Sequence, residues 1–314
     1  MSEPVIRWVA SGNERAVSEI VAELGANDTG ALADGRVFVD GRRATDPNGV
    51  VRAGSVLEVY AARGIERDVT VLAEHAGFVF VDKPPGIATE PDHAGVEASL
   101  VARVAERLGV PRSELHALSR LDVGVSGVVT LARTAEAREH ATKLRERGAW
   151  HRRYVALALR APEPANGIWD QALARPRGAR SGRQSERTAS TRYGLAGTAG
   201  PVFVPSRAGN AEVRPALLAL APVTGRTHQL RMHAAGGGVP LLGDATYGGP
   251  ERLVLASGAV RPLERVALHA AWVELELQGQ KLRVGAPIPA DLSALWRELG
   301  GEEEAWARAL ELAL

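Results

Sequence analysis

The 314-residue chain contains no cysteine. This absence excludes disulfides, thiolate catalysis, iron–sulfur clusters and zinc sites built on cysteine. Long apolar runs are also missing, because no stretch approaches the roughly 18–20 residues that a bilayer-spanning helix needs. The first fifteen residues lack the charged start and apolar centre of a secretory signal. Together these absences predict a cytoplasmic protein that has no membrane partner.

The chain also lacks a regular alternation of strands and helices, which argues against a doubly wound nucleotide-binding fold. No internal repeat is visible. The residues that are present are typical of a folded protein, since 45% of them are apolar and 24% are charged. At roughly 150 residues per domain, the length suggests about two domains.

Charge is balanced overall but unevenly distributed. The net charge is +1, which alone does not predict a nucleic-acid partner. Residues 143–192, however, contain twelve basic and four acidic side chains, a net charge of +8, so the rest of the chain carries −7. Such asymmetry is a hint of a polyanionic partner. The alternative is compositional, because the chain is rich in arginine and has only three lysines.

Residues 1–62 are predicted to form a small separate domain. Apolar residues at helical spacing indicate a helix between 16 and 24, followed by strands at 36–39 and 55–60. The pattern G-R-V-F-V-D-G followed by V-R-A-G-S-V-L-E-V resembles the small αL RNA-binding module of a ribosomal protein. The basic pair usual in that module is absent at 27–31, so a small capping domain without a ligand is the alternative.

A larger α+β domain is predicted from 69 to 314, after a linker at 61–68. Its expected strands are 77–81, 123–132, 154–159, 216–220 and 266–277. Its expected helices are 98–108, 135–147, 227–235, 291–299 and 302–314. Residues 161–187 are predicted to be a long loop or hairpin. In the last helix, Trp306, Leu310 and Leu314 would share one face, which is expected to pack on the body of the protein. The oligomeric state is not readable from the sequence.

Asp122 lies at the start of a predicted apolar strand, in the segment S-R-L-D-V-G-V-S-G (119–127). The small residues after it let a ligand or another backbone approach closely. Because an isolated buried carboxylate is costly, this aspartate must be paired or solvated. On the local pattern alone, an N-capping or turn aspartate is the competing interpretation.

The segment T-G-R-T-H-Q-L-R-M-H (224–233) is dense in hydrogen-bond donors. Gly225 suggests a turn into a helix N-terminus, where anions bind readily. Thr227 and Arg231 would then share one face of that helix. A zinc site is excluded here, because the two histidines are five residues apart with no carboxylate between them.

Four segments taken together are far more specific than any one of them. They are F-V-F-V-D-K-P-P-G-I-A-T-E-P (78–91), S-R-L-D-V-G-V-S-G-V-V-T-L-A-R (119–133), R-R-Y-V-A-L (152–157) and T-G-R-T-H-Q-L-R-M-H with P-L-L-G-D-A-T-Y-G (224–248). In this order and spacing, they resemble the RluA-type pseudouridine synthases over about residues 69–290. The resemblance implies a bent, largely antiparallel mixed sheet flanked by helices, with the active site in a central cleft. It also implies that uridines in structured RNA, ribosomal RNA more than transfer RNA, are isomerised without metal or organic cofactor.

The resemblance also implies roles for individual residues. Asp122 would be catalytic, Tyr154 would lie against the uracil, and Arg231 would pair with the catalytic carboxylate. Arg120 matches an arginine that helps to fill the space left by a flipped base. The other expected substrate contacts are Arg153, Arg226, Thr227 and His228. Ser119 departs from the usual histidine of the family, and Arg153 replaces its usual lysine.

The chemistry agrees with these residue types. Cleavage of the glycosidic bond develops positive charge on the sugar, which a nearby carboxylate stabilises, as in glycoside hydrolysis. An adjacent arginine favours the ionised form of a carboxylate. The target base must leave its stack in the RNA to reach the carboxylate in the cleft. The residues leave open whether Asp122 bonds to the sugar or removes a sugar proton.

Two other functions remain as alternatives. A non-catalytic RNA-binding or assembly protein on the same fold would account for Ser119 and for the missing basic pair at 27–31. A hydrolase of glycosidic bonds would need a second positioned carboxylate. Asp82 and Asp244 are the candidates for it in the matched segments.

Overall fold

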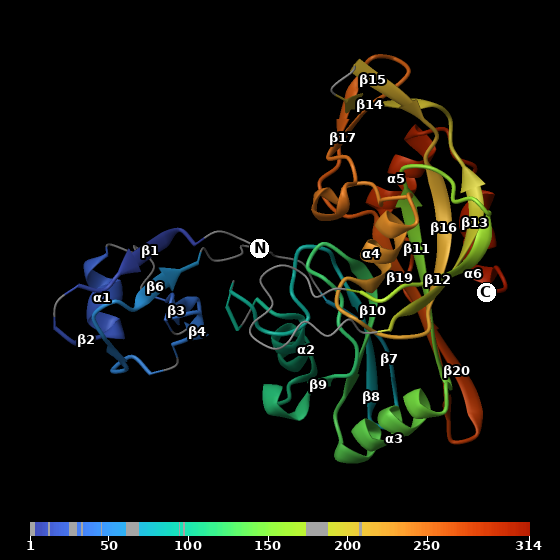
Figure 1. Cartoon of the computed structure of the whole chain (residues 1–314). Coiled ribbons are helices and arrows are strands. Elements are labelled where there is room, and N and C mark those ends of the chain that lie inside the picture. Colours follow the sequence, from blue (N-terminus) through green and yellow to red (C-terminus); the bar gives the residue numbers. More distant parts are fainter. Residues whose placement is uncertain are drawn as a thin grey trace.

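The chain forms two units of unequal size in a computed structural model (Figure 1). The structure describes residues 4–11, 13–24, 30–32, 34–44, 46–60, 69–93, 95–96, 98–173, 188–206 and 209–314. The predicted linker at 61–68 lies outside these described residues. None of the described helices is long and apolar enough to cross a membrane.

The small unit has its own sheet and its own core. An antiparallel sheet has the strand order β1-β6-β3-β4, and β2 pairs with β5. Helix α1 buries Val17 and Ile20 in the core of this unit. The elements are β1 (Ile6–Val9), β2 (Arg15–Ala16), α1 (Val17–Glu23), β3 (Val37–Val39), β4 (Arg42–Arg43), β5 (Val50–Val51) and β6 (Val56–Val59). The assignment to the αL type and the domain limits 1–62 and 69–314 stay predictions.

The small unit contacts the larger one at His93 and Val96. The ring centroid of His93 lies 4.3 Å from that of Phe38 and 4.4 Å from that of Tyr60. The backbone N–H of Val96 donates a hydrogen bond to the carbonyl oxygen of Asp34, at 2.7 Å. Because residues 88–93 also line the large cleft described below, the small unit is joined to one wall of that cleft.

The large unit is built on a ten-stranded sheet. Its main path is β12-β13-β16-β11-β19-β10-β8-β7, with β20 beside β19 and β9 beside β10. The described strands of this sheet pair antiparallel except β10 and β19, which are parallel. The strands are β7 (Thr70–His75), β8 (Phe78–Lys83), β9 (His116–Ala117), β10 (Ser126–Ala132), β11 (Trp150–Ala158), β12 (Asn166–Asp170), β13 (Ser190–Thr198), β16 (Ala216–Pro222), β19 (Leu268–Leu277) and β20 (Gln280–Gly285). The predicted α+β class, with a large mixed sheet flanked by helices, is confirmed.

Local sequence signals set several helix ends. Ser99 accepts a hydrogen bond from the N–H of Ala102 at the start of α2 (Leu100–Leu108), and Gly109 ends this helix in the left-handed conformation. Thr134 accepts from the N–H of Ala137 at the start of α3. The other helices are α3 (Ala135–Glu146), α4 (Gln229–Gly236), α5 (Ala290–Glu298) and α6 (Glu304–Glu311), with short 3₁₀ turns at Arg112–Glu114 and Ala245–Tyr247.

The segment between β11 and β16 contains four strands in its described residues. β12 lies within 161–187, the range predicted as a long loop or hairpin, and it pairs antiparallel with β13, which follows that range. β14 (Val202–Ser206) and β15 (Gly209–Val213) come next. Together with β17 (Arg252–Val254) and β18 (Val260–Pro262), the last two form a separate four-stranded sheet at the top of Figure 1. These strands are short and lack a clear apolar alternation, which is why the sequence pattern did not reveal them.

The last helix is shorter than predicted. It ends at Glu311, so Leu314 does not share a helical face with Trp306. A Cβ atom on Gly194 of β13 would lie 2.4 Å from the side chain of Leu312 and 3.0 Å from that of Leu314. The two leucines therefore pack over a bare glycine backbone, which draws the chain out of the helix. Trp306 itself is buried in the core.

Strand β11 separates two apolar cores. Tyr154 and Ala156 face the core that contains Leu230 of α4, whereas Val155 faces the core that contains Trp296 of α5. This alternation is the period of two that a strand requires. The face that carries Tyr154 also lines the cleft, so the strand presents this tyrosine to the cleft.

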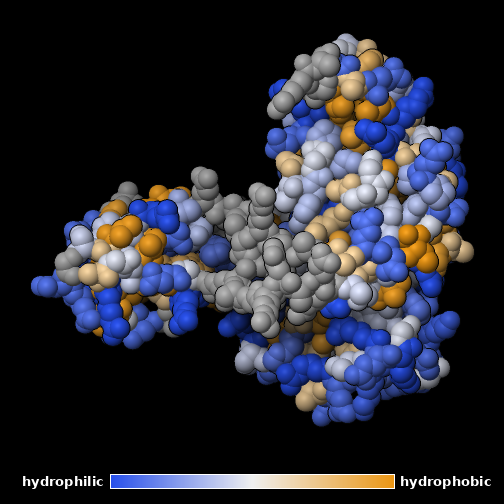
Figure 2. All heavy atoms as spheres, in the orientation of Figure 1, coloured by the Kyte–Doolittle hydropathy of each residue, from blue (hydrophilic) through white to orange (hydrophobic). Residues whose placement is uncertain are grey.

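Hydrophilic residues cover most of the face seen in Figure 2, with apolar residues in small patches between them. The exposed large apolar side chains of the described residues are Val5, Val9, Val50, Ile168, Val223 and Val260. Single exposed apolar side chains of this kind are ordinary on folded proteins. The large apolar side chains of the described residues therefore lie mainly in the cores.

His269 of β19 makes stability depend on pH. Its side chain is fully buried, and burial lowers its pKa from the usual 6.5 to about 4. The unfolded chain therefore binds a proton here at a higher pH than the folded protein does. By linkage, a contribution of about 3 kcal/mol is present above pH 6.5 and is lost as the pH falls towards 4.

Urea unfolding of wild type and His269→Gln between pH 4 and pH 7 measures this effect. The free energy of unfolding should fall more steeply with acid in wild type than in the variant. Equal slopes in the two proteins would show that this histidine is not the titrating group.

Candidate active site

A large open cleft of about 2280 Å³ lies on the face of the sheet that carries Tyr154. Its walls are four segments from distant parts of the chain. These are residues 88–93, residues 117–125, the start of β11 at 150–154 and residues 221–232. Each of the four overlaps one of the segments on which the family resemblance rests. The fold therefore brings these segments, which are far apart in sequence, to one site.

Asp122 lies in a tight turn just before β10. Its carbonyl oxygen accepts a hydrogen bond from the N–H of Val125, at 3.0 Å. The next carbonyl, of Val123, accepts from the N–H of Gly86 at 2.7 Å and from Nζ of Lys83 at 3.3 Å. Lys83 is fully buried and also donates to two other backbone carbonyls, so it anchors the turn to the loop after β8. The carboxylate of Asp122 is about a quarter exposed and faces the cleft.

Arg231 joins Asp122 to a second, buried carboxylate. Its Nη1 donates to Oδ2 of Asp122 at 2.9 Å. Its Nε and Nη2 donate to the two oxygens of Asp244, at 2.8 and 2.7 Å. Burial alone would lower the pKa of Arg231, but the hydrogen bonds to Asp244 and Asp122 raise it above its usual value. The guanidinium is thus a permanent, doubly anchored cation that orients the carboxylate of Asp122.

Tyr154 and His228 complete the surroundings of this carboxylate. Tyr154 is 8% exposed, and burial raises its pKa, so the phenol is neutral at pH 7. Nε2 of His228 lies 3.7 Å from Oδ1 of Asp122, the oxygen that Arg231 does not contact. Nδ1 of His228 lies 2.8 Å from the hydroxyl of Tyr247. Burial lowers the pKa of His228, so this imidazole is neutral at pH 7 as well.

The start of α4 differs from the prediction. His228 has a φ of 55°, in the left-handed region, and the helix begins only at Gln229. The predicted helical face shared by Thr227 and Arg231 is therefore wrong. The reason lies in the side chain of Gln229, whose Oε1 accepts from the hydroxyl of Thr224 at 2.7 Å and from the N–H of Arg226 at 3.0 Å. These hydrogen bonds hold the chain in a turn before the helix begins.

Gln229 is also a structural residue that the sequence interpretation missed. Its Nε2 donates to the carbonyl of Ser190 and to Oγ1 of Thr191, both at 3.0 Å. Oγ1 of Thr191 in turn lies 2.8 Å from Nδ1 of His233. This buried network ties α4 to β13, about forty residues away. No local pattern could have indicated it, because the partners are distant in sequence.

The predicted substrate contacts fall into two groups. Arg120, Arg226 and Thr227 are exposed and line the cleft, and Nη1 of Arg120 lies 3.2 Å from Oε2 of Glu90. Arg153 is different, because its Nη2 donates to the carbonyl of Leu312 at 2.7 Å and its guanidinium lies over the ring of Trp272. Arg153 belongs to the wall of the cleft, but its guanidinium is directed to Leu312 and Trp272, so its role as a substrate contact stays a prediction.

Arg152 is the strand arginine beside the cleft. Its Nη2 donates to the carbonyl of Thr224 at 2.8 Å, next to Arg226. Arg145 and Arg192, from the basic stretch 143–192, also line the cleft. Residues 174–187 of that stretch lie outside the described residues. In the described part of the basic stretch 143–192, several arginines therefore lie around one cleft.

The two candidates for a second hydrolytic carboxylate are not free beside Asp122. Asp244 is 1% exposed and holds the guanidinium of Arg231 with both oxygens. Asp82 lies in β8, where burial raises the pKa of its carboxyl, and it does not line the cleft. A hydrolase would need an acid and a base placed on either side of the scissile bond. The arrangement around Asp122 does not favour that function.

Two solved structures share the fold of this chain. The human protein RNA pseudouridylate synthase domain containing 1 matches with a TM-score of 0.56 and 20% identity, over 80% of this chain and 98% of that chain. The human protein RNA pseudouridylate synthase domain containing 4 matches with a TM-score of 0.54 and 21% identity, over 73% of this chain and 92% of that chain. The fold is thus that of pseudouridylate synthases.

Sequence comparison narrows the class to a family. The family model for RNA pseudouridylate synthase matches residues 77–236. Ribosomal large subunit pseudouridine synthase D of Xanthomonas campestris is 31% identical, over 90% of this chain and 86% of the relative. The enzyme of the same name from Vibrio vulnificus is 28% identical, over 91% of this chain and 90% of the relative. The chain belongs to the RNA pseudouridylate synthases of the RluA type, and it is an isomerase that acts on RNA uridines.

Proposed function

We propose that this enzyme isomerises uridines of large-subunit ribosomal RNA and that Asp122 is its catalytic residue. The observation that carries the proposal is the carboxylate of Asp122, open to the cleft and held by Arg231 at 2.9 Å. Two relatives that align over most of their length are named as enzymes of the large ribosomal subunit, which supports that choice of RNA. Residues 69–314 would form the catalytic domain, and residues 1–62 an RNA-binding-like module attached to it.

The isomerisation needs no oxidant or reductant, because uridine and pseudouridine have the same atoms and the same number of electrons. The bond between N1 and C1′ breaks with its electron pair moving to the uracil, which then turns so that C5 bonds to C1′. The proton on C5 is lost and N1 gains one. Developing positive charge at C1′ is stabilised by the carboxylate of Asp122. Bonding to the sugar and removal of a sugar proton would both use Oδ1, the oxygen that Arg231 leaves free.

Tyr154 and His228 would position the uracil during this rearrangement. The neutral phenol ring of Tyr154 offers an apolar face on which the base can lie. If Nδ1 of His228 accepts from the hydroxyl of Tyr247, its proton is on Nε2, which points towards Asp122. In this tautomer, Nε2 can donate to a uracil carbonyl as negative charge develops on the departing base.

RNA would bind with the target base flipped out of its stack and into the cleft. Arg120 would then leave its exposed ion pair with Glu90 and fill the space in the RNA stack that the flipped base has left. Breaking this ion pair costs little free energy, because exposed ion pairs are weak. Arg152, Arg226 and Thr227 lie where phosphates of the flanking nucleotides can be reached.

Purified protein and RNA transcripts labelled with tritium at C5 of uridine test this proposal. Release of tritium should be faster with large-subunit ribosomal RNA than with transfer RNA, and pseudouridine should form in equal amount. Faster release from transfer RNA would contradict the proposed substrate. Tight binding of every RNA with no tritium release would instead favour the non-catalytic RNA-binding function.

A further inference from the structure

Arg265 connects the N-terminal end of α5 with the turn that carries Asp122. The residue lies just before β19, and its side chain is about 10% exposed. Nε and Nη2 bind the two carboxylate oxygens of Asp291, at 2.5 and 2.9 Å. Such a bidentate pair fixes the plane of the guanidinium as well as its position. Asp291 belongs to the first turn of α5, so the rigid helix sets the direction in which Nη1 points.

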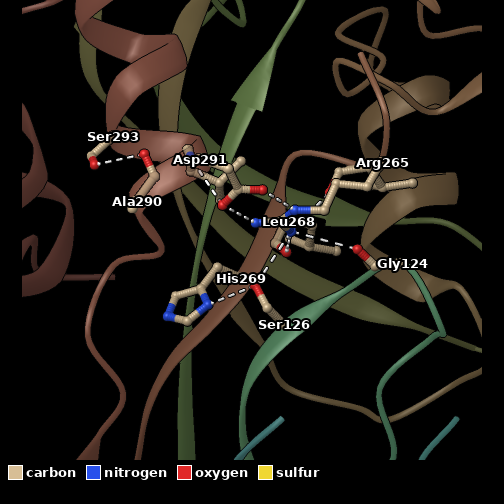
Figure 3. Close-up of polar contacts among 10 residues, drawn as sticks. Gly124, Ser126, Arg265, Leu268, His269, Ala290, Asp291 and Ser293 are labelled. Atoms are coloured by element: carbon tan, nitrogen blue, oxygen red, sulfur yellow. Dashed lines mark hydrogen bonds and ion pairs between the residues drawn. The ribbon is translucent and has the colours of Figure 1, made fainter. Parts of the chain in front are cut away.

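Nη1 of Arg265 points at oxygens of the turn and of β19 (Figure 3). It lies 3.5 Å from the carbonyl oxygen of Gly124 and 3.3 Å from Oγ of Ser126. Towards β19, it lies 3.3 Å from the carbonyl of Val266 and 3.4 Å from that of Leu268. This one nitrogen thus connects the turn after Asp122 and the first residue of β10 with the start of β19.

Ser126 and His269 strengthen the same connection. Oγ of Ser126 lies 3.0 Å from Nδ1 of His269, which belongs to β19. The pair has the composition of a nucleophile and its base, but Ser126 is 2% exposed and His269 is fully buried. Substrate cannot reach such a pair, so its contribution is to hold β10 in register with β19. A Cβ on Gly127, the next residue of β10, would lie 2.2 Å from the carbonyl oxygen of Ala270, which shows how closely the two strands approach.

We infer that Arg265 is a positioning residue for catalysis, acting through the backbone of residues 124–126 on the place of Asp122. This inference rests on the proposed role of Asp122. Lys83 holds the turn at Val123, and Arg265 holds it at Gly124 and Ser126. The carboxylate of Asp122 therefore meets Arg231 from a backbone that is anchored at the residues directly after Asp122. A displacement of about 1 Å at a reacting group can cost about a hundredfold in rate.

The test compares single-turnover pseudouridine formation and RNA affinity in four variants. Arg265→Gln should lower the rate constant by about tenfold or more with RNA affinity unchanged within about twofold, because Arg265 acts on geometry and not on RNA. Arg265→Lys should recover only part of the rate, since an ammonium group cannot reproduce the fork to Asp291. Asp291→Asn should give a smaller loss in the same direction, and it serves as the test if Arg265→Gln does not fold.

Arg261→Gln is the matched control. Nε of Arg261 lies 3.0 Å from Oε2 of Glu298, so this arginine ties β18 to the other end of α5 without a contact to the Asp122 turn. Its rate constant should equal that of wild type. An unchanged rate in Arg265→Gln, an equal fall in the control, or a parallel loss of RNA affinity would each overturn the inference.

Hydrogen exchange separates this inference from the proposed function. The amides of residues 123–127 should exchange faster in Arg265→Gln than in wild type and stay unchanged in Arg261→Gln. This readout requires no RNA and no activity. Unchanged exchange in Arg265→Gln would refute the anchoring role, whatever the reaction of the wild-type enzyme is.

Discussion

Replacement of Asp122 by asparagine should lower the rate of pseudouridine formation by about a thousandfold or more while RNA affinity stays near that of wild type. Asparagine keeps the size of the side chain and an oxygen that can accept from Nη1 of Arg231 at the same distance. It removes the negative charge that the developing sugar cation needs. The loss should therefore appear in the chemical step and not in binding.

Single-turnover tritium release and filter binding measure the two quantities separately for Asp122→Asn. Asp170→Asn is the control, because this exposed carboxylate of β12 does not line the cleft. The control should behave like wild type. Residual turnover within tenfold of wild type in Asp122→Asn would exclude this residue as the catalytic carboxylate.

Arg231→Ala should damage both catalysis and stability, because Arg231 has two carboxylate partners. Loss of the guanidinium leaves Asp244, which is 1% exposed, as a buried and unpaired carboxylate. Breaking a buried pair in this way costs about 3–5 kcal/mol of stability. Loss of the partner of Asp122 should lower turnover by about a hundredfold or more, the typical cost of one preorganised donor at a reacting centre. RNA affinity should change far less than turnover.

A second substitution separates these two effects. Arg231→Ala combined with Asp244→Asn removes the buried charge, so most of the free energy of unfolding should return. Turnover should not return, because Asp122 still lacks its partner. Recovery of both quantities together would mean that Arg231 acts only by stabilising the fold, and equal losses of turnover and RNA affinity would assign it to RNA binding.

The main elements of the large unit were predictable because their signals are local. Helix α3 was predicted to within one residue, since Thr134 caps its start and Gly148 follows its end. Strand β19 was predicted as an alternating segment over 266–277 and β11 as a strand over 154–159. β11 begins four residues earlier than predicted, and β19 begins two residues later. The separate sheet of β14, β15, β17 and β18 was not predicted, because such short strands gain their stability from partners elsewhere in the chain.

The candidate site was predictable only through the combination of four segments. Asp122 alone fits an ordinary turn, and the turn is indeed what the structure contains. Sequence could not reveal that Asp244 is the second partner of Arg231, because that depends on how the loop after α4 folds back. Arg153 was predicted as a substrate contact, and sequence could not show that its guanidinium is held by Leu312 and Trp272. An irregularity in the pairing of β11 and β19 lies between Arg153 and Tyr154. The direction of a side chain at such a bulge does not follow from alternation.

The role of Arg265 could not be predicted from the sequence either, for a third reason. Nothing in its neighbourhood in the sequence marks it as different from the other arginines of an arginine-rich chain. Its partners are Gly124 and Ser126, about 140 residues before it, and Asp291, 26 residues after it. Long-range contacts of this kind decide how rigidly a catalytic residue is held, and only the folded structure brings them together.

The most direct test of the central claim is a pseudouridine map of total RNA from cells that lack this gene. The account predicts that at least one site in large-subunit ribosomal RNA is lost on deletion. That site should return when wild type is supplied and should stay unmodified when Asp122→Asn is supplied at an equal level. A map that deletion leaves unchanged, or a site that Asp122→Asn restores, would contradict the account.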